Sequence, residues 1–379
     1  MKNRKEGNCK NTDILLSKKA YKLKKYQEKI MNSRERVLTA LDRKQPDAVP
    51  FLEIAIDEEV GFRLLGTTQE KERFLPMLRL KDSGARIGPM RGDGLYLYKL
   101  AQKLHLDGFG FRIEPPLFVK TKTSGGREYI VDGKIKTREN LVRIRMPDPD
   151  DTMLYAPARK FLDNYKDTYA AFAVINIGPE PAMLSMGQEH FFISLYENKN
   201  LVKDVLNLYC DWTARALKYI QDMDFDFIWS SDDLAYNSGP MFSPQMFQSI
   251  VLPPMRQVAQ NITLPWIFHS DGNLMPILDD IIDLGISALH PIEPKAMDII
   301  HLKQAYGGKI CLVGNIDLNT LSRGTPQEVE EETRRKIRKV GPGGGYIVSS
   351  GNSITSYCKP ENVLAMSQAI LHYGTYPVS

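Results

Sequence analysis

The chain has 379 residues, of which 42% are hydrophobic and 25% are charged, and this composition is typical of a globular protein with one large domain or two smaller ones. It excludes a disordered or fibrous protein. The formal charge of +4 comes from residues 1–30, which hold ten Lys or Arg against three acidic residues, so the rest of the chain carries −3. A slightly acidic body offers no basic face to a phosphate backbone, so no nucleic-acid partner is expected.

Residues 1–30 form a basic extension that we interpret as a solvated tail or an extra helix before a domain over residues 31–379. The extension lacks the apolar segment of about 7–15 residues of a signal peptide, and it is rich in Lys rather than in Arg and Ser as transit peptides are. No apolar run approaches the roughly 18 residues of a membrane span. The four cysteines are scattered, without the spacing of a zinc ribbon or the density of a disulfide framework. The sequence therefore predicts a cytoplasmic protein without a membrane partner.

The predicted domain begins with a helix that Asn32 or Ser33 caps, with Val37, Leu38 and Leu41 on one face. Short β-rich runs then recur along the chain, each ending at polar or glycine residues. These runs cover residues 49–54, 106–113, 169–178, 225–233, 265–272, 285–292, 309–317 and 345–353.

Helical patterns such as residues 191–222 and 326–340 separate most of these runs, so the chain alternates between strand and helix. Eight units of this kind predict a single α/β domain, a (β/α)8 barrel. A doubly wound open sheet is the rival fold, but it explains less well the count of eight and the absence of a Gly-x-Gly-x-x-Gly turn after the first strand. Residues 127–153 break the alternation and are predicted to be an inserted β-hairpin with Asp132-Gly133 at its turn.

Polar side chains end every predicted strand, and in a (β/α)8 barrel all these ends meet at one mouth, where active sites lie. The mouth is rich in carboxylates and imidazoles and poor in Arg and Lys, which suits a divalent metal, or acid and base catalysis on an uncharged substrate, better than a polyanion. Its members are Glu53, Asp57, Arg112, Glu114, Asn176, Glu180, Asp232, Asp233, His269, Asp271, His290, Glu293, Asn315, Asp317, Ser349, Ser350 and Asn352.

His269 and Asp271 are two residues apart at the end of one predicted strand, so their side chains point to the same side and could hold a metal together. The alternative is that Asp271 caps the following helix while His269 bonds a neighbouring carbonyl. Asp232 and Asp233 could likewise be helix caps or members of a buried ion pair. His290, before Pro291, could be part of the loop structure.

Several long segments resemble the uroporphyrinogen decarboxylase superfamily, which includes porphyrinogen decarboxylases and corrinoid- or thiol-directed methyltransferases built on one barrel. The resemblance covers residue 31 to the end of the chain. The segments that carry it are NSRERVLTALDRKQPDAVP (32–50), WSSDDLAYNSGPMFSPQMFQSIVLPPMRQV (229–258), residues 268–317 and the closing GGYIVSSGNSI.

Two departures from the family patterns guide the choice of subgroup. The decarboxylases carry an Arg-Gln-Ala-Gly-Arg motif after the first strand for a substrate with eight carboxylates, whereas this chain has EIAIDEEVGFRLLG (53–66). We expect Glu53, Asp57, Glu58 and Glu59 to repel such a substrate. The thiol-activating methyltransferases bind zinc through His-x-Cys and a later Cys, but this chain has His269-Ser270-Asp271 and Gly351, so hard oxygen replaces soft sulfur.

This pattern most resembles the methyltransferases of anaerobic bacteria that demethylate an O-methyl or N-methyl compound and pass the methyl group to a separate corrinoid protein. The resemblance implies zinc as a cofactor and a small methylated substrate, and it leaves a homodimer open. The implied roles are catalytic for His269, Asp232 and Glu53, substrate-binding for Asn176, Asp233, Asn315 and Ser350, and metal-binding for His269, Asp271, Glu180 and Glu293. The alternatives are a uroporphyrinogen decarboxylase and a non-catalytic barrel that binds a ligand or a corrinoid.

Overall fold

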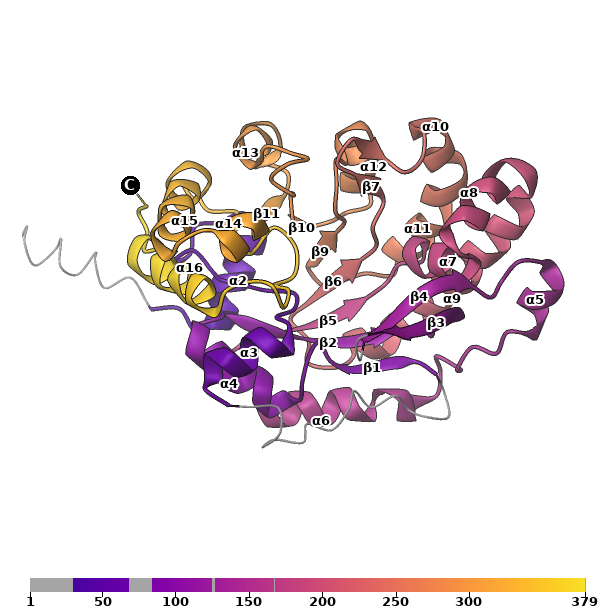
Figure 1. The fold of residues 1–379 in the computed structure, drawn as a ribbon, viewed down its shortest axis with the longest axis horizontal. Coiled ribbons are helices and arrows are strands. Elements are labelled where there is room, and N and C mark those ends of the chain that lie inside the picture. The colour runs from indigo at the N-terminus through magenta and orange to yellow at the C-terminus, as the bar shows by residue number, and fades with distance from the viewer. Residues whose placement is uncertain (1–29, 68–83, 125–126, 167, 379) are drawn as a thin grey trace, which may run out of the picture.

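The computed structural model describes residues 30–67, 84–124, 127–166 and 168–378 (Figure 1). The basic extension expected over residues 1–30 lies outside the described residues, apart from Ile30. No helix of the described ranges is both long and apolar enough to cross a membrane.

A central sheet of eight strands organises the described part of the chain. All neighbouring strands are parallel except β1 and β2, which are antiparallel. In spatial order the strands are β1 (Arg86–Pro89), β2 (Gly108–Glu114), β5 (Ala170–Ile175), β6 (Phe227–Ser231), β9 (Trp266–His269), β10 (Ala288–His290), β11 (Cys311–Val313) and β12 (Tyr346–Ile347).

Helices surround this sheet (Figure 1). The α-helices are α2 (Ser33–Leu41), α3 (Glu58–Leu65), α4 (Gly94–Leu104), α5 (Arg138–Arg143), α6 (Ala156–Tyr165), α7 (Pro179–Met186), α8 (Gln188–Glu197), α9 (Lys199–Gln221), α10 (Pro244–Met246), α11 (Leu252–Ala259), α12 (Leu278–Ile282), α13 (Ile299–Tyr306), α14 (Leu318–Arg323), α15 (Pro326–Val340) and α16 (Pro360–Tyr373). Shorter elements are η1 (Thr152–Tyr155), η2 (Phe247–Val251), η3 (Met275–Ile277) and the strand pair β7 (Ala235–Tyr236) and β8 (Gly239–Pro240).

The strands follow one another across the sheet in chain order, without the reversal of order that defines a doubly wound sheet. The predicted strand over residues 49–54 forms only isolated bridges, one of them a parallel bridge between Phe51 and Val348. The amide of Leu52 donates to the carbonyl of Val348 at 3.1 Å, and the amide of Asp107 donates to the carbonyl of Phe51 at 2.8 Å. The segment is therefore bonded both to the residue that follows β12 and to the residue that precedes β2.

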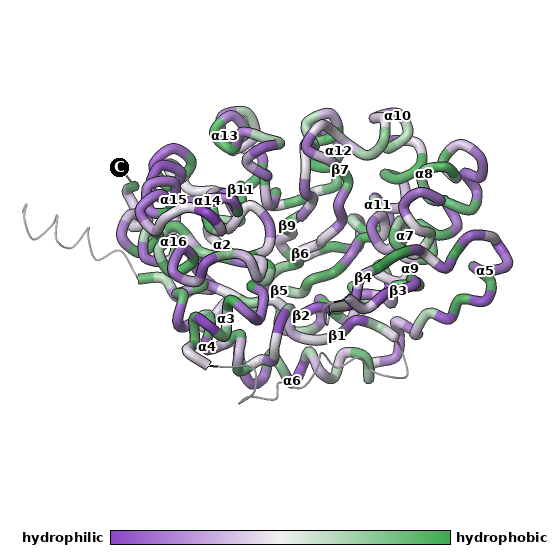
Figure 2. The backbone as a smooth tube through the Cα atoms, viewed as in Figure 1, coloured by the Kyte–Doolittle hydropathy of each residue, from purple (hydrophilic) through white to green (hydrophobic). Residues whose placement is uncertain are grey.

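Hydrophobic residues occupy the central strands, as the green segments of Figure 2 show, and all six residues of β5 are buried. Two apolar clusters form. The larger one packs helices against the sheet, and the smaller one takes alternate residues from successive strands. Members of the smaller cluster include Leu52, Phe172, Trp229, Ile267 and Val313. This alternation is what the inward-facing side chains of parallel strands produce.

The inserted hairpin lies earlier in the chain than predicted. It consists of β3 (Val119–Ser124) and β4 (Arg127–Gly133), with Ser124 opposite Arg127 and Lys120 opposite Asp132. Asp132-Gly133 therefore lies at the open end, and its assignment to the turn was wrong. A Cβ on Gly133 would lie 2.1 Å from the amide nitrogen of Gly187, so this glycine allows close packing against the junction of α7 and α8.

The first helix begins as predicted. Asn32 accepts a hydrogen bond from the amide of Glu35, whose side chain accepts one from the amide of Asn32, so the two residues form a capping box for α2. From this helix Arg36 donates to Asp107 at 2.6 Å, and Asp107 also accepts from the amide of Phe51 at 2.9 Å. The carboxylate of Asp107 thus joins α2, the 49–54 segment and the start of β2.

We expect Asp107→Ala to destabilise the protein by about 3 kcal/mol, because it leaves both a largely buried guanidinium and a buried amide without this acceptor. Asp42→Ala is the matched control, since Asp42 pairs with Lys44 on the surface and its loss should cost less than about 0.5 kcal/mol. Urea unfolding of the two variants measures the difference. Equal stabilities would contradict the proposed role of Asp107.

Candidate active site

The parallel registers of β6, β9 and β10 bring three strand ends into one row. Ser231 is opposite His269, and His269 is opposite His290. Asp233 lies two residues after Ser231, and Asp271 lies two residues after His269. Adjacent strands whose ends are in register therefore deliver two carboxylates to the same imidazole.

Asp233, His269 and Asp271 form a cluster in which one ligand atom of each residue lies within 4.8 Å of the others. The Nε2 atom of His269 lies 3.6 Å from Asp233 Oδ1 and 3.8 Å from Asp271 Oδ1. The His269 side chain is only 7% exposed. The amide of Asp271 also donates to Asp233 Oδ1 at 2.9 Å, which fixes one carboxylate relative to the other.

His290 holds the imidazole of His269 from behind. The two Nδ1 atoms are 2.7 Å apart, and Nε2 of His290 lies 3.3 Å from the hydroxyl of Ser349. Burial lowers the pKa of both histidines, so the pair is neutral. This contact leaves Nε2 of His269 facing the carboxylates. His290 was expected at the mouth without an assigned site role, because only the strand register reveals this contact.

Asp271 is not a helix cap. The short helix η3 begins without a side-chain cap, and the amide of Met275 is bonded instead to Asn273. One carboxylate oxygen of Asp271 accepts from the side-chain Nδ2 of Asn352, while its buried Oδ1 has no hydrogen-bond partner among the described residues. Burial, followed by the charges of Asp233 and Glu293, raises the pKa of Asp271 to about 8. An unpaired buried oxygen beside an imidazole is an arrangement that favours a ligand.

Asp232, which the sequence analysis assigned to catalysis, faces away from this cluster into the start of α7. Its carboxylate accepts from the amides of Ile177 at 2.6 Å and Glu180 at 3.1 Å, and the residue is fully buried. Burial raises the pKa of Asp232 to about 8 against the effect of these hydrogen bonds. Its neighbour Asp233, predicted to bind substrate, is the residue that joins His269.

Glu180 and Glu293, two of the expected metal ligands, lie outside the three-residue cluster. Glu293 accepts from the amide of Gly272 at 3.2 Å. Glu180 accepts from the side-chain Nδ2 of Asn176 at 3.4 Å, and burial, followed by the charges of Asp232 and Asp233, raises its pKa well above the usual range. Both carboxylates thus border the cluster, and Asp233 lies nearer to His269 Nε2 as a third candidate ligand.

The mouth contains an arginine that the sequence analysis missed. Arg86 comes from β1, a four-residue strand too short to recognise from its pattern, and its guanidinium lies 2.6 Å from Glu114 and 3.0 Å from the Asn176 oxygen. Arg112 lies 3.2 Å from the same carboxylate. These contacts place Asn176 in a polar cluster on the β1–β2 side of the mouth, which is less poor in arginine than expected.

Glu53 and Ser350, predicted as catalytic and substrate-binding residues, contact each other between two neighbouring segments of the mouth. The amide and the hydroxyl of Ser350 each donate to the Glu53 carboxylate at 2.7 Å. Burial raises the pKa of Glu53 to about 8 despite these bonds. Asn315, also predicted to bind substrate, donates to the carbonyl of Ile292 at 2.6 Å, and its buried side-chain oxygen has no hydrogen-bond partner in the described ranges.

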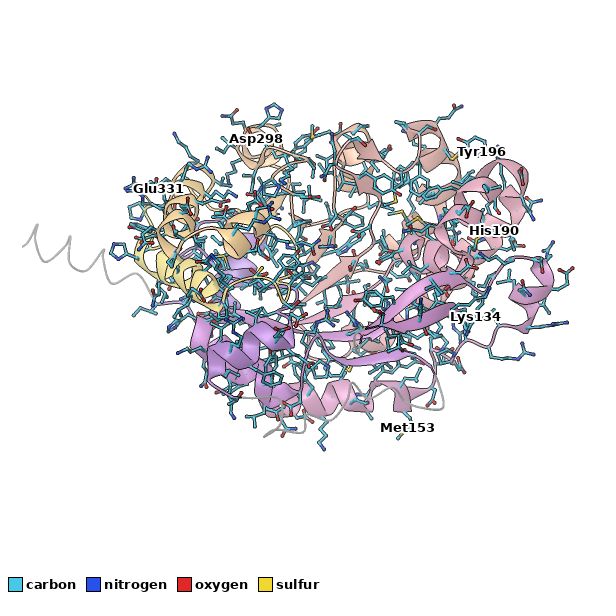
Figure 3. All side chains as sticks on the ribbon, viewed as in Figure 1. Lys134, Met153, His190, Tyr196, Asp298 and Glu331 are labelled. Atoms are coloured by element: carbon cyan, nitrogen blue, oxygen red, sulfur yellow. The ribbon has the colours of Figure 1, made fainter. Side chains whose placement is uncertain are left out.

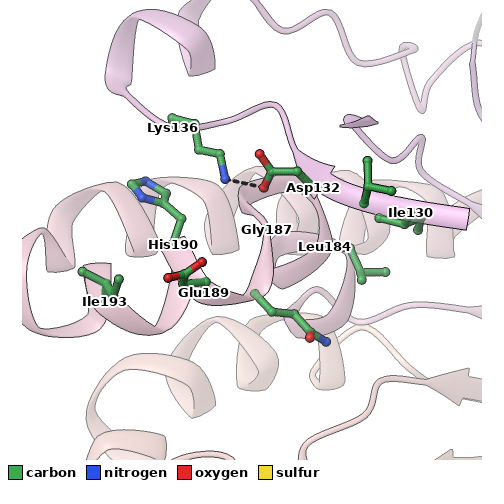
Figure 4. Close-up of a pocket in the computed structure, with 10 residues that line it drawn as sticks. Ile130, Asp132, Lys136, Leu184, Gly187, Glu189, His190 and Ile193 are labelled. Carbon is green, nitrogen blue, oxygen red and sulfur yellow. Dashed lines mark hydrogen bonds and ion pairs between the residues drawn. The ribbon is translucent and has the colours of Figure 1, made fainter. Parts of the chain in front are cut away.

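A cleft of about 600 Å³ opens beside the cluster, with Glu293 and Asn352 in its wall. Another cavity, of about 730 Å³, lies between β4 and α8, where Asp132, Lys136 and His190 line it (Figure 4). None of the strand-end residues of the mouth lines this second cavity. The cleft is therefore a space that the candidate site can use.

Glu53 gives the stability of the protein a distinct pH dependence. Because its pKa is higher in the folded than in the unfolded chain, ionising it opposes folding, so its stabilising effect is complete at acidic pH and is lost as the pH rises toward 8. Between about pH 5 and pH 8 we expect the free energy of unfolding of the wild type to fall by on the order of 3 kcal/mol relative to that of Glu53→Gln. Urea unfolding at both pH values measures this, with the exposed Glu197→Gln as the control. Parallel pH profiles for wild type and Glu53→Gln would contradict it.

Comparison with known proteins identifies the relatives of this chain. A family model described as uroporphyrinogen decarboxylase (URO-D) matches residues 130–373. The uroporphyrinogen decarboxylase of Methylococcus capsulatus is 25% identical over 255 residues, which cover 63% of this chain and 70% of that enzyme. A methylated-thiol–coenzyme M methyltransferase of Methanosarcina mazei is 26% identical over 133 residues, about a third of each chain (35% and 34%).

Among solved structures, a methyltransferase from Methanosarcina mazei superposes on 90% of this chain and 99% of its own, with a TM-score of 0.66 and 17% identity. At that identity the likeness shows the fold alone. The segment matched by the family model includes Asp233, His269 and Asp271 and all strands from β5 to β12. The expected family is thereby confirmed: the chain belongs to the uroporphyrinogen decarboxylase family, with relatives among both its decarboxylases and its methyltransferases.

Proposed function

We propose that this protein is a methyltransferase that moves a methyl group from a small O-methyl or N-methyl compound to a corrinoid protein. The observation that carries the proposal is the cluster of Asp233, His269 and Asp271 at the strand ends. The cluster offers one imidazole and two carboxylates. An enzyme that decarboxylates a substrate with eight carboxylate groups would need cations at this place. We also propose that the hydrogen bonds of Phe51 and Leu52 close the sheet into a (β/α)8 barrel around this site.

The residues of the cluster fit a divalent cation. Zinc accepts imidazole nitrogen and carboxylate oxygen at about 2.0–2.2 Å, and its catalytic sites use three protein ligands and leave one position open. His269 Nε2 and the unpartnered Asp271 Oδ1 are 3.8 Å apart, so small side-chain movements would allow both to bind one ion. Asp233 would be the third ligand. A divalent cation such as zinc, when bound there, supplies a Lewis acid for the departing oxygen or nitrogen, and the partner's corrinoid supplies the methyl acceptor.

The other residues of the mouth would position the donor and keep its surroundings dry. His290 orients the imidazole of His269 through the contact between their Nδ1 atoms. Glu53, which burial keeps protonated near neutral pH, and Asn315, whose side-chain oxygen is unpaired, can orient a polar group of the substrate. Asp232 supports the site indirectly by bonding the turn that carries Glu180.

Decarboxylation of uroporphyrinogen is the second candidate function, because this chain aligns with 70% of the length of a uroporphyrinogen decarboxylase. The structure changes one argument against it. Asp57 accepts from the amide of Glu59 and caps α3, and Glu58 accepts from the amide of Gly92, so both carboxylates have a local structural role. The case against decarboxylation rests instead on Asp233 and Asp271 at the strand ends. A third candidate is a non-catalytic barrel that binds a ligand or a corrinoid.

The metal site is tested by titrating the metal-free protein with Zn²⁺ or Co²⁺ in a calorimeter. His269→Ala and Asp271→Ala should each weaken binding by at least about tenfold, because each removes one ligand. Asp298→Ala is the control: Asp298 caps α13 at the periphery (Figure 3), so its loss should cost about 1 kcal/mol of stability without changing metal affinity. Affinities that stay the same in both ligand variants would exclude this cluster as the metal site.

Methyl transfer is tested by incubating the protein with reduced cobalamin and a panel of methoxylated aromatics and methylamines, and following methylcobalamin by its absorbance. We expect transfer by the wild type and loss of at least about a hundredfold in rate for His269→Ala, because the departing atom loses charge stabilisation worth several kcal/mol. Uroporphyrinogen is assayed in parallel. Its turnover at about one per second or faster, with no transfer across the panel, would instead favour the decarboxylase.

A further inference from the structure

We infer that the cleft beside the metal cluster binds a carboxylate group of the methyl donor, through Lys295 and Arg323. The inference rests on the proposed function and deepens it, because it names the class of substrate: a methylated compound that also carries a carboxylate. Lys295 follows the end of β10 by five residues, and Arg323 is the last residue of α14. Both line the cleft that Glu293 and Asn352 connect to the cluster.

The size of the cleft argues against a very small donor. A volume of about 600 Å³ lies within the range of roughly 300–1,000 Å³ that holds an organic ligand of drug size, and it exceeds by far the roughly 30 Å³ that one water molecule occupies in the liquid. Methanol or methylamine would leave most of it to solvent. Leu318, Pro294 and Tyr357 contribute apolar or aromatic surface against which a larger body can pack.

The acidic side chains of the cleft have hydrogen-bond partners in the protein, whereas its basic side chains have no ion-pair partner among the described residues. Its two carboxylates have partners in the protein: Glu293 accepts from the amide of Gly272, and Asp317 accepts from the amide and the side chain of Asn319 at 2.8 and 2.9 Å. By contrast, no described carboxylate lies within ion-pair distance of Lys295 or Arg323. An anion entering the cleft would therefore meet two available cations, one of which can form a bidentate pair.

The two ends of the site then fix the orientation of the donor. Asp233 and Asp271 already supply two carboxylates to the metal end, whereas Lys295 and Arg323 supply the cations of the cleft, so the carboxylate of the donor is assigned to the cleft end. The neutral methyl-bearing end would point to His269. The same arrangement explains how an acidic mouth can accept an anionic substrate: the charge stays in the cleft, and only the methyl ether or amine reaches the cluster.

Equilibrium binding of 4-methoxybenzoate and its neutral analogue 4-methoxybenzamide tests the inference in the metal-loaded protein by isothermal calorimetry. We expect the benzoate to bind at least tenfold more tightly than the amide, and Lys295→Gln and Arg323→Gln each to weaken benzoate binding by at least threefold while leaving amide binding unchanged. Both residues are exposed, so the variants should fold, and thermal unfolding confirms this. Lys160→Gln, an exposed lysine of α6 outside the cleft, is the matched control.

Equal binding of the two ligands, absence of binding by both, or an unchanged benzoate affinity in both cleft variants would overturn the inference. Its failure can be told apart from failure of the proposed function. Selective benzoate binding that depends on Lys295 and Arg323, without methyl transfer to cobalamin, would support the subsite and count against the methyltransferase. Methyl transfer at equal efficiency from the acid and the amide would support the methyltransferase and exclude the subsite.

Discussion

The hydrogen-bonding contact between the Nδ1 atoms of His269 and His290 is the constraint on which the candidate site depends. It joins the ends of two adjacent parallel strands and commits one nitrogen of His269 to the protein interior. The other nitrogen can then face only the two carboxylates that follow the neighbouring strand ends. A ligand imidazole held in this way needs little reorganisation to bind an ion, because its ring orientation is set by the residue behind it.

Burial shapes the chemistry of the mouth as much as the identity of its residues does. The carboxyls of Glu53, Asp232 and Asp271 each have a pKa raised to about 8, in every case with desolvation as the largest cause. Near neutral pH the mouth is therefore less negative than its sequence implies. Protonated carboxyls can donate hydrogen bonds, and they do not repel an approaching anion, so an acidic composition is compatible with an anionic substrate in the neighbouring cleft.

The two proposals divide one site into a reactive end and a recognition end. Strand ends supply the reactive end, because their backbone hydrogen bonds hold Asp233 and His269 at fixed positions. Loop and helix residues supply the recognition end, with Lys295 after β10 and Arg323 at the end of α14. This division is usual for such folds, in which rigid strands carry the chemistry and the loops that follow them vary with the substrate.

The sequence by itself determined the order of the parallel strands β2, β5, β6 and β9 to β12, the capping of α2 by Asn32 and the presence of His269 and Asp271 at one strand end, because periodicity and cap chemistry are local properties of the chain. Only the tertiary structure decided that Asp233 rather than Glu180 or Glu293 completes the cluster. Strand register, which depends on contacts between distant segments, sets these choices. For the same reason the sequence could not reveal the contact of His290 with His269, the arginine that the short strand β1 brings to the mouth, or the glycine that packs at the base of the hairpin instead of forming its turn.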